Sequence, residues 1–303
     1  MNSLNALPLL IAAVLAPLAQ GVINRTKAIV AGRVGQPLIQ PYRDMLKLIR
    51  KGAVYSETTS WIFQAGPVAG LAAVLCAGAL VPLAALPALA EFRGDIVVIA
   101  YLLAAGRLFT ILAALDTGSS FEGMGASREA AFSALAEPSL FLALAALARR
   151  AGTASLTPAI AAVSARTWTQ AAPALCLVLG ALLIVFLCEN SRIPIDDPTT
   201  HLELTMIHEV MVLDHGGPDL AMIEYAGALK MWVLGAILVG VALPFHSGAV
   251  WIDTAIALAG IFALAIVVGL IESLMARLRL LRVPELLIAA TILAALALVL
   301  VRR

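Results

Sequence analysis

The 303-residue chain is 62% hydrophobic and 13% charged, with 20 Lys and Arg, 19 Asp and Glu, and a formal net charge of +1. Ordinary soluble domains have about a quarter charged residues, so this composition predicts a protein whose solvent is lipid. The near-neutral charge excludes a basic nucleic-acid binder and an acidic disordered tail. Cys76, Cys176 and Cys188 lie far apart in apolar surroundings, without a CxxC pair. They predict no zinc, iron-sulfur or disulfide site and are interpreted as small core residues.

Eight segments approach the roughly twenty apolar residues that a membrane-spanning helix needs. They predict an all-α, polytopic membrane helical bundle, with residues 1–303 forming a single integral membrane domain. The expected spans are approximately 4–23, 61–90, 96–115, 129–147, 171–188, 227–245, 250–271 and 284–301. The first has no basic region before it and contains Pro8 and Pro17, so it is expected to stay in the membrane rather than be cleaved as a signal peptide.

The distribution of Lys and Arg predicts the orientation of this bundle. Thirteen of the 20 lie on the side reached after the odd-numbered spans, six lie on the other side, and Arg107 lies within a span. Positively charged loops are retained in the cytoplasm, so we expect both termini to be extracytoplasmic. The segments expected on the cytoplasmic side are 24–60, 116–128, 189–226 and 272–283.

The first cytoplasmic segment predicts an amphipathic helix. Tyr42, Met45, Leu46 and Ile49 share one helical face, and basic residues occupy the rest. This pattern is typical of a helix that lies in the membrane interface. It either anchors the chain to the membrane surface or forms a lip under which a partner docks.

Residues 116–130 form a polar, glycine-rich segment that predicts a loop. Ser127 is expected to cap the following helix and to place Glu129 in its first turn, at the positive end of the helix dipole.

Glu137 lies eight residues beyond Glu129, about 12 Å further along the same apolar helix. A carboxylate at this depth needs a partner or a proton. Arg107 lies at a comparable depth in the preceding span, so the two residues form either a buried ion pair or part of a proton path.

Residues 189–227 carry the densest set of ionisable side chains. Pro194 and Pro198 break the helical geometry, and a capping box at Thr200 and Glu203 predicts a helix over residues 200–213. That helix would carry His201, Glu203, His208 and Glu209. It has no HExxH motif and no i, i+4 histidine pair, so no metal site is expected. Carboxylates with interleaved histidines favour either proton entry or a polar docking surface.

Several motifs resemble one known family across essentially the whole chain. The run from Glu189 to Asp196 resembles the cytoplasmic loop of subunit 1 of NADH dehydrogenase, respiratory complex I. The relatives in formate hydrogenlyase and energy-converting (group 4) nickel-iron hydrogenase complexes are more similar still. The motifs that carry this similarity are YRDMLKL at 42–48, LDTGS and GASREA within 115–130, DDPTTHLELTMIHE at 196–209 and ESLMARLRL at 272–280. Ile195, Thr199, Thr200 and Ala136 depart from the complex I pattern, which favours the hydrogenase-type branch over quinone binding.

The resemblance implies a non-catalytic membrane subunit that links a peripheral redox arm to proton or sodium translocation in a bacterial inner membrane. The implied partners are a small iron-sulfur subunit, a large nickel-iron subunit and antiporter-like membrane subunits, with the iron-sulfur clusters and nickel-iron centre held by those partners and no cofactor bound here. The implied ion path contains Glu137, Glu189, Glu203, Glu209, Asp116 and Glu129. The implied loop and docking residues are Arg128, Arg192, Asp196, Asp197, His201, His208, Arg277, Arg279 and Arg282, of which the last three are alternatively interfacial arginines.

Two other functions remain open at this point. One is the quinone-chamber subunit of a complex I-type enzyme, which the loop departures disfavour. The other is a stand-alone secondary transporter, which the buried charges favour and the absence of a visible internal repeat disfavours.

Overall fold

The computed structural model describes residues 3–196 and 206–301. The α-helices are α1 Leu7–Val30, α2 Gln40–Ile49, α3 Trp61–Ala79, α4 Asp95–Asp116, α5 Ser120–Ala151, α6 Leu156–Ala161, α7 Ala165–Glu189, α8 Gly217–Ala242, α9 Val250–Leu274 and α10 Val283–Leu300. Three 3-10 helices, η1 Ser3–Ala6, η2 Glu209–Val212 and η3 Leu280–Arg282, complete the described regular structure. The predicted all-α fold is confirmed.

Eight of the helices in the described ranges are long and apolar enough to cross a membrane. They are α1 extended by η1, α3, α4, α5, α7, α8, α9 and α10 extended by η3. The expectation of one span over residues 61–90 is wrong, because α3 ends at Ala79 and residues 80–94 form an irregular segment containing Pro82 and Pro87. Helix α8 begins at Gly217, ten residues before the expected start; Gly217, Asp219 and Ala221 in its first turns are buried, and α2 packs on this helix.

The expected loop at 116–130 is also largely helical, because α5 begins at Ser120. Only Gly118, with φ of +69°, marks the sharp turn from α4 into α5. Ser127 therefore caps nothing; its hydroxyl donates to the Met124 carbonyl inside the helix. Glu129 lies ten residues into α5 rather than in its first turn, so its environment is set by tertiary neighbours and not by the helix dipole.

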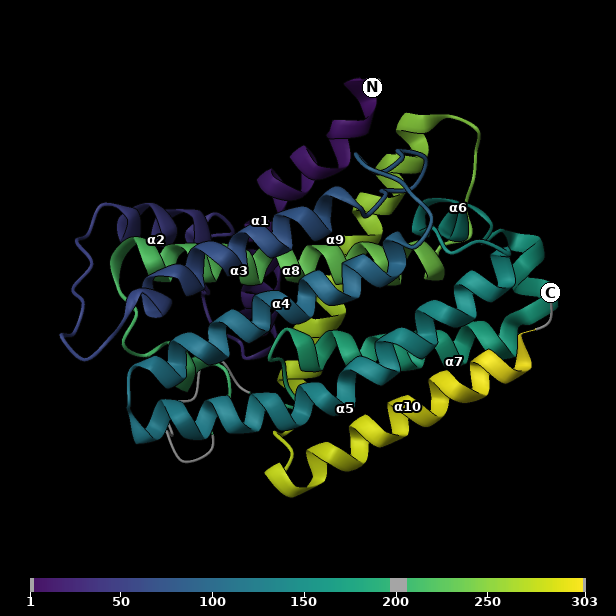
Figure 1. The fold of residues 1–303 in the computed structure, drawn as a ribbon. Coiled ribbons are helices and arrows are strands. Elements are labelled where there is room, and N and C mark those ends of the chain that lie inside the picture. Colours follow the sequence, from purple (N-terminus) through teal and green to yellow (C-terminus); the bar gives the residue numbers. More distant parts are fainter. Residues whose placement is uncertain (1–2, 197–205, 302–303) are drawn as a thin grey trace.

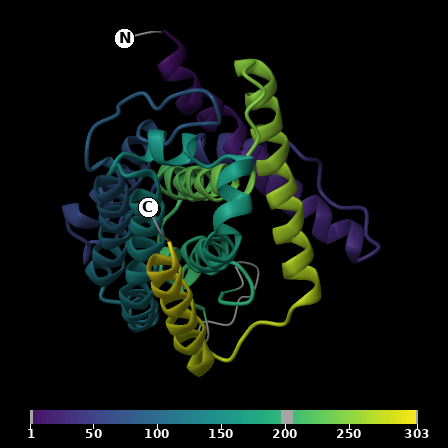
Figure 2. The same cartoon turned by 90° about the vertical axis from the view of Figure 1, so that its right-hand side faces the viewer.

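The spans pack into one connected bundle (Figures 1 and 2). Helix α3 packs on α4 and α8, and α5 packs on α4, α7 and α10, whereas α9 packs on α1 and α8. Small residues permit the close α3–α4 contact: Gly70 and Gly106 face each other, and an added Cβ on Gly66 would lie 2.8 Å from the Cβ of Ala113.

One end of the bundle, which we call the polar end, consists of the described residues 31–60, 117–119, 190–196, 206–216 and 275–282. The described chain crosses the bundle eight times, so α1 begins and α10 ends at the same end of the bundle. This end is opposite the polar end. Most of the candidate residues from the sequence therefore gather near one end.

Helix α2 lies along the polar end and matches its predicted helical segment. Met45 is buried, whereas Leu46 and Ile49 are exposed beside the basic side chains. The Tyr42 hydroxyl donates to the Val14 carbonyl of α1, which ties α2 to the membrane bundle.

The cysteines differ from expectation. Cys76 and Cys176 lie exposed on the outer surface of the bundle, and only Cys188 is partly buried. The prediction that all three are core residues is wrong, because an apolar position in a membrane helix can face lipid as readily as the protein interior.

Candidate functional site

A buried arginine joins two membrane carboxylates. The Arg107 guanidinium on α4 donates to Glu189 Oε1 at 2.6 Å and to Glu137 Oε1 at 2.9 Å. Glu189 is the last residue of α7 and its side chain is 3% exposed, whereas the side chain of Glu137 on α5 is 38% exposed. The predicted Arg107–Glu137 pair is therefore present, but it is one half of a three-residue network that runs from the interior to the surface.

Further charges on α5 and α8 extend this network. Lys230 on α8 lies 3.8 Å from Glu189 Oε2. Glu129 lies within electrostatic reach of both Lys230 and Arg107, and it is eight residues, about two helix turns, from Glu137 on the same helix. We call these five residues the arginine cluster: Arg107, Glu129, Glu137, Glu189 and Lys230.

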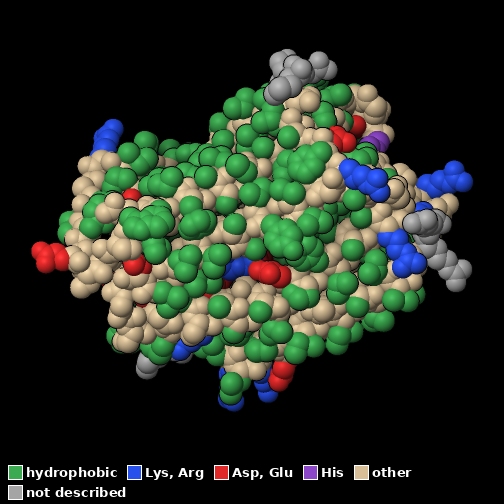
Figure 3. Space-filling view, in the orientation of Figure 1, with side chains coloured by type: hydrophobic (Ala, Val, Ile, Leu, Met, Phe, Trp, Pro, Cys, Tyr) green, Lys and Arg blue, Asp and Glu red, His purple; other side chains and the backbone are tan. Residues whose placement is uncertain are grey.

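The fold leaves one end of the arginine cluster open. Figure 3 shows acidic and basic side chains together in the middle of an otherwise hydrophobic face over α4 and α5. Leu108 and Leu112 of α4 are exposed large hydrophobic residues that flank this region. A carboxylate in such a face is costly against lipid.

A second ion network lies between α1, α9 and the segment after α7. Glu272 has a fully buried side chain, with Lys27 Nζ at 2.8 Å from Oε2 and Arg192 at 3.3 Å from Oε1. The Arg192 guanidinium also contacts the Met231 sulfur at 3.7 Å. We call Lys27, Arg192 and Glu272 the lysine–arginine cluster. Glu272 opens the predicted ESLMARLRL motif, but its pairing with α1 was not predicted because Lys27 lies in a distant part of the chain.

Asp196 organises the polar end directly above these networks. Its carboxylate accepts backbone hydrogen bonds from Ile207 and His208 at 3.3 and 3.0 Å, and it pairs with Arg277 at 2.9 Å. Arg128 on α5 donates to the Met206 carbonyl at 2.8 Å. These contacts of Asp196 and Arg128 hold residues 206–208 against α5, and Arg277 contacts Asp196 of this chain.

The remaining predicted residues have varied positions. Asp116 accepts from the Ser60 amide and hydroxyl and from the Phe63 amide, so it caps the N-terminus of α3. Glu209 begins η2, and within the described residues 206–213 only this 3-10 turn is helical, not the expected α-helix. Arg279 and Arg282 are exposed beside α10. Asp197, His201 and Glu203 lie outside the described residues.

Two histidines at the polar end are held neutral. Burial, the largest effect, and the charge of Lys230 together lower the pKa of His208 to about 4, against the opposing effect of Glu189. Burial also lowers the pKa of His215, although Asp219 and Asp214 oppose this shift. The His215 ring stacks on Phe63 with centroids 3.9 Å apart. His208 is thus electrically coupled to the arginine cluster, and no His, Cys, Asp and Glu group in the described chain has the arrangement of a metal site.

Comparison with known proteins supports the resemblance seen in the motifs. Formate hydrogenlyase subunit 4 of Escherichia coli (strain K12) is 31% identical over 271 residues, covering 88% of this chain and 87% of that protein. Hydrogenase-4 component C of the same organism is 33% identical over 233 residues, covering 76% and 72%.

Among solved structures, a chain of the membrane-bound sulfane sulfur reductase, an archaeal respiratory membrane complex, matches with a TM-score of 0.85 at 21% identity. The match covers 99% of this chain and 98% of that one, and it shows a shared fold. A family model described as NADH dehydrogenase matches residues 4–302. The chain is therefore a multi-pass membrane protein of the NADH dehydrogenase family, related to the formate hydrogenlyase and hydrogenase-4 subunits.

Proposed function

We propose that this chain is the membrane coupling subunit of a redox-driven ion pump, which anchors a hydrogenase-like arm and starts an ion path toward antiporter-like membrane subunits. The observation that carries the proposal is the sharing of Arg107 between buried Glu189 and half-exposed Glu137. The names of the two Escherichia coli relatives support a hydrogenase-type arm.

The arginine cluster has the charge balance that proton transfer requires. Its three carboxylates exceed its two basic side chains, so one carboxylate at a time is able to accept a proton without leaving a cation unpaired. His208, at the polar end of the bundle, lies within electrostatic reach of Glu189 and Lys230. The proposed path runs from the His208–Glu209 turn through Glu129 and Glu189 to Glu137. Glu203 is a further candidate that lies outside the described residues.

The exposed end at Glu137 supports a membrane partner at the α4–α5 face. A carboxylate that is 38% exposed in the middle of a hydrophobic face would be solvated poorly by lipid. A neighbouring membrane subunit with polar groups at the same membrane depth as Glu137 would cover this carboxylate and continue the ion path.

The redox arm is proposed to dock on the polar end. The surface there combines α2, residues 206–216 and the described part of the loop after α7, all held by side-chain contacts. Because nine Lys and Arg lie in the segments of this end and only Arg93 lies in residues 80–94, 152–164 and 243–249 at the other end, we propose that the polar end is cytoplasmic and that both termini are extracytoplasmic.

Cysteine labelling tests this orientation. In a variant without the natural cysteines, Arg93→Cys should react with an impermeant maleimide in intact cells, whereas Arg33→Cys should react only after permeabilisation. Both residues are exposed, so accessibility within the subunit does not distinguish them. The reverse labelling pattern would contradict the proposed docking face.

The ion path is tested with Glu137→Gln, which keeps the hydrogen-bonding shape and removes the charge and the exchangeable acid. The complex should assemble and retain redox turnover with artificial acceptors, but ion translocation coupled to turnover should fall at least about tenfold, the scale of a lost proton-transfer group. Glu57→Gln, an exposed residue away from the cluster, is the matched control and should pump normally. Wild-type pumping by the Gln variant would remove Glu137 from the path.

A further inference from the structure

Residues 31–51, which comprise α2 and the turns on either side of it, carry an unbalanced positive charge. They contain five basic residues and a single acid, Asp44. The Asp44 carboxylate accepts a hydrogen bond of 2.8 Å from the Gln40 amide rather than from a basic side chain. The five basic residues are all exposed, and within the described chain none of them forms an ion pair: Arg33, Arg43, Lys47, Arg50 and Lys51.

Large hydrophobic side chains are exposed among these charges. On α2, Leu46 is 56% and Ile49 is 58% exposed, and Val34 in the preceding turn is 99% exposed. Leu46 and Ile49 are three residues apart, so they share one flank of the helix. Met45 on the adjoining side is buried where α2 packs on α1 and α8. Helix α2 therefore has an apolar flank that the described chain leaves uncovered.

The basic side chains of α2 form one edge of this apolar flank. Arg43, Lys47 and Arg50 follow at i, i+4 and i+7, which places them in a row along the helix. Arg43 lies three residues before Leu46 and Arg50 lies four residues after it, so the row runs beside the flank. Asp44 lies beyond the row and leaves that side of α2 to the proposed docking surface. Long basic side chains beside apolar ones are typical of a helix in a membrane interface.

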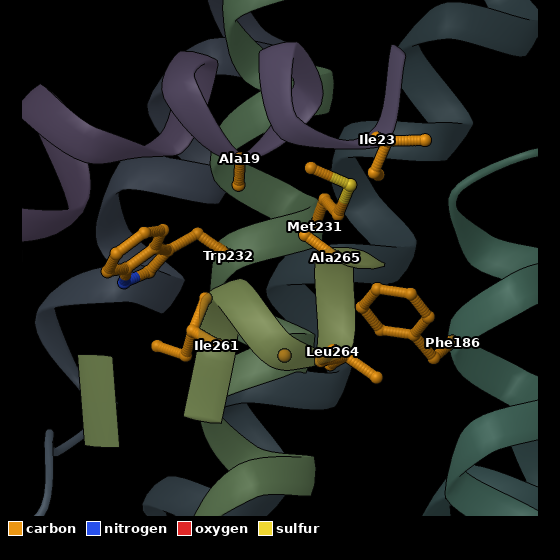
Figure 4. A pocket seen from close by; sticks show the side chains of 9 residues that line it. Ala19, Ile23, Phe186, Met231, Trp232, Ile261, Leu264 and Ala265 are labelled. Atoms are coloured by element: carbon orange, nitrogen blue, oxygen red, sulfur yellow. The ribbon is translucent and has the colours of Figure 1, made fainter. Parts of the chain in front are cut away.

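Helix α1 carries this segment on its outer face. Ala19 and Ile23 of α1 point inward, where they line a small apolar cavity with residues of α7, α8 and α9 (Figure 4). Gly21 is two residues from each of them, about 200° around the helix, and so lies on the opposite side. There the Leu38 carbonyl approaches so closely that an added Cβ on Gly21 would collide with it. The turn before α2 is thus packed on the side of α1 that faces away from the bundle.

The same side of α1 has exposed apolar residues of its own. Leu10 is 57% and Val14 is 62% exposed, on a helix long and apolar enough to cross a membrane. The Val14 carbonyl accepts the hydrogen bond from the Tyr42 hydroxyl of α2. The apolar flank of α2 therefore adjoins the exposed apolar surface of a membrane span, and one bilayer is able to cover both.

A packed protein interface matches this surface poorly. Interface cores are depleted of charged residues, and of Lys in particular. Here basic residues border the apolar ones both on α2 and in the turn before it, where Arg33 precedes Val34. The interfacial region of a bilayer accommodates both kinds of side chain, because the apolar ones enter the acyl boundary while the cations reach lipid phosphates.

We infer that α2 and its flanking turns form a binding surface for the anionic headgroups of the bilayer. Leu46 and Ile49 enter the boundary between headgroups and acyl chains, and Arg43, Lys47 and Arg50 contact lipid phosphates. This surface contains no member of the arginine cluster and does not depend on the proposed coupling function.

Photo-crosslinking in the assembled complex identifies what covers α2. The photoreactive residue p-benzoylphenylalanine takes the place of Ile49 or, as the control on the far side of the helix, of Asp44. The complex is placed in liposomes of equal amounts of phosphatidylglycerol and phosphatidylcholine with identical acyl chains, and adducts are counted by mass spectrometry. Position 49 should give phospholipid adducts with roughly tenfold more phosphatidylglycerol, the contribution of one or two basic residues beside an anionic surface. Position 44 should give few lipid adducts.

Two double variants with the crosslinker at position 49 test the charge. Arg43→Gln with Lys47→Gln should bring the ratio of the two lipid adducts close to one. Arg93→Gln with Arg166→Gln, which removes two exposed arginines at the opposite end of the bundle, should leave the tenfold ratio unchanged. Because Arg43 and Lys47 are exposed and form no ion pair in the described chain, their replacement leaves the packing of α2 intact.

Three results would overturn this inference. Adducts from position 49 that are mainly protein would identify a partner subunit as the occupant, and the absence of any adduct would show that the flank faces water. Equal labelling of the two lipids in the wild-type background would remove the role of the basic row. If the complex does not assemble with the crosslinker at position 49, Leu46 on the same flank takes its place with the same expected outcomes.

Discussion

The two buried ion networks differ in the sign of their charge surplus. The arginine cluster has three carboxylates and two basic groups, whereas the lysine–arginine cluster has one carboxylate and two basic groups. The arginine cluster therefore has a carboxylate that is able to take up a proton. In the lysine–arginine cluster the single carboxylate is shared by both basic groups. Burial alone does not identify an ion path; the carboxylate surplus and the open end at Glu137 distinguish the candidate path from a structural anchor.

The largest expected effect comes from removing the shared arginine. Arg107→Leu should destabilise the subunit by about 3–5 kcal/mol, because it leaves Glu189 buried without its closest partner. The measurement is the thermal unfolding of the purified complex. Adding Glu137→Gln and Glu189→Gln to the same chain should restore most of this stability, and no restoration would mean that Arg107 stabilises the bundle by packing rather than by charge.

Removing the acid of the second network sharpens the contrast. Glu272→Gln should destabilise the complex by about 2–4 kcal/mol, since Lys27 and Arg192 lose their common partner while Lys27 keeps partial access to solvent. The ratio of ions moved to electrons transferred should remain that of wild type. A changed ratio in assembled complexes would place Glu272 in the ion path and remove the distinction between the clusters.

The smallest effect concerns pH and reports on His208, which is electrically coupled to the arginine cluster. His208 in the folded protein has a pKa of about 4, below the ordinary value of 6.5, so the unfolded chain binds more protons between these two values. Stability should therefore fall as pH drops from about 6.5 to 4, by about 1–3 kcal/mol at most. Hydrogen exchange of residues 206–216 at pH 7.5 and 5 measures this loosening.

A matched pair of histidine variants checks the assignment. His208→Gln should flatten the pH dependence of exchange, and His246→Gln, at the opposite end of the bundle, should leave it unchanged. An unaltered pH response in His208→Gln would assign the titration to another group at the polar end.

Local sequence patterns were sufficient for the membrane character, the all-α fold and the eight spans, because each span must carry enough apolar residues to satisfy lipid regardless of its neighbours. The same reasoning singled out Glu137 and Arg107, since ionisable groups stand out in apolar segments. The motifs also identified the family that the comparisons support.

Helix boundaries near the polar end required the tertiary structure. A prediction from hydropathy places the end of a span where charged residues begin. Helix α5 nevertheless includes Arg128 and Glu129, because protein contacts such as that of Arg128 with the Met206 carbonyl surround those side chains. The early start of α8 has the same cause. Local composition contains no information about which segments cover one another.

The ion networks themselves were decided only by the tertiary fold. Arg107 meets Glu189 across 82 positions, and Arg192 meets Glu272 across 80. The sequence places each charge on a helix, but the packing of α4, α5 and α7 determines that one arginine serves two carboxylates. The divergence of α9 from α10 is likewise a property of packing, because it depends on which helices each of the two finds as neighbours.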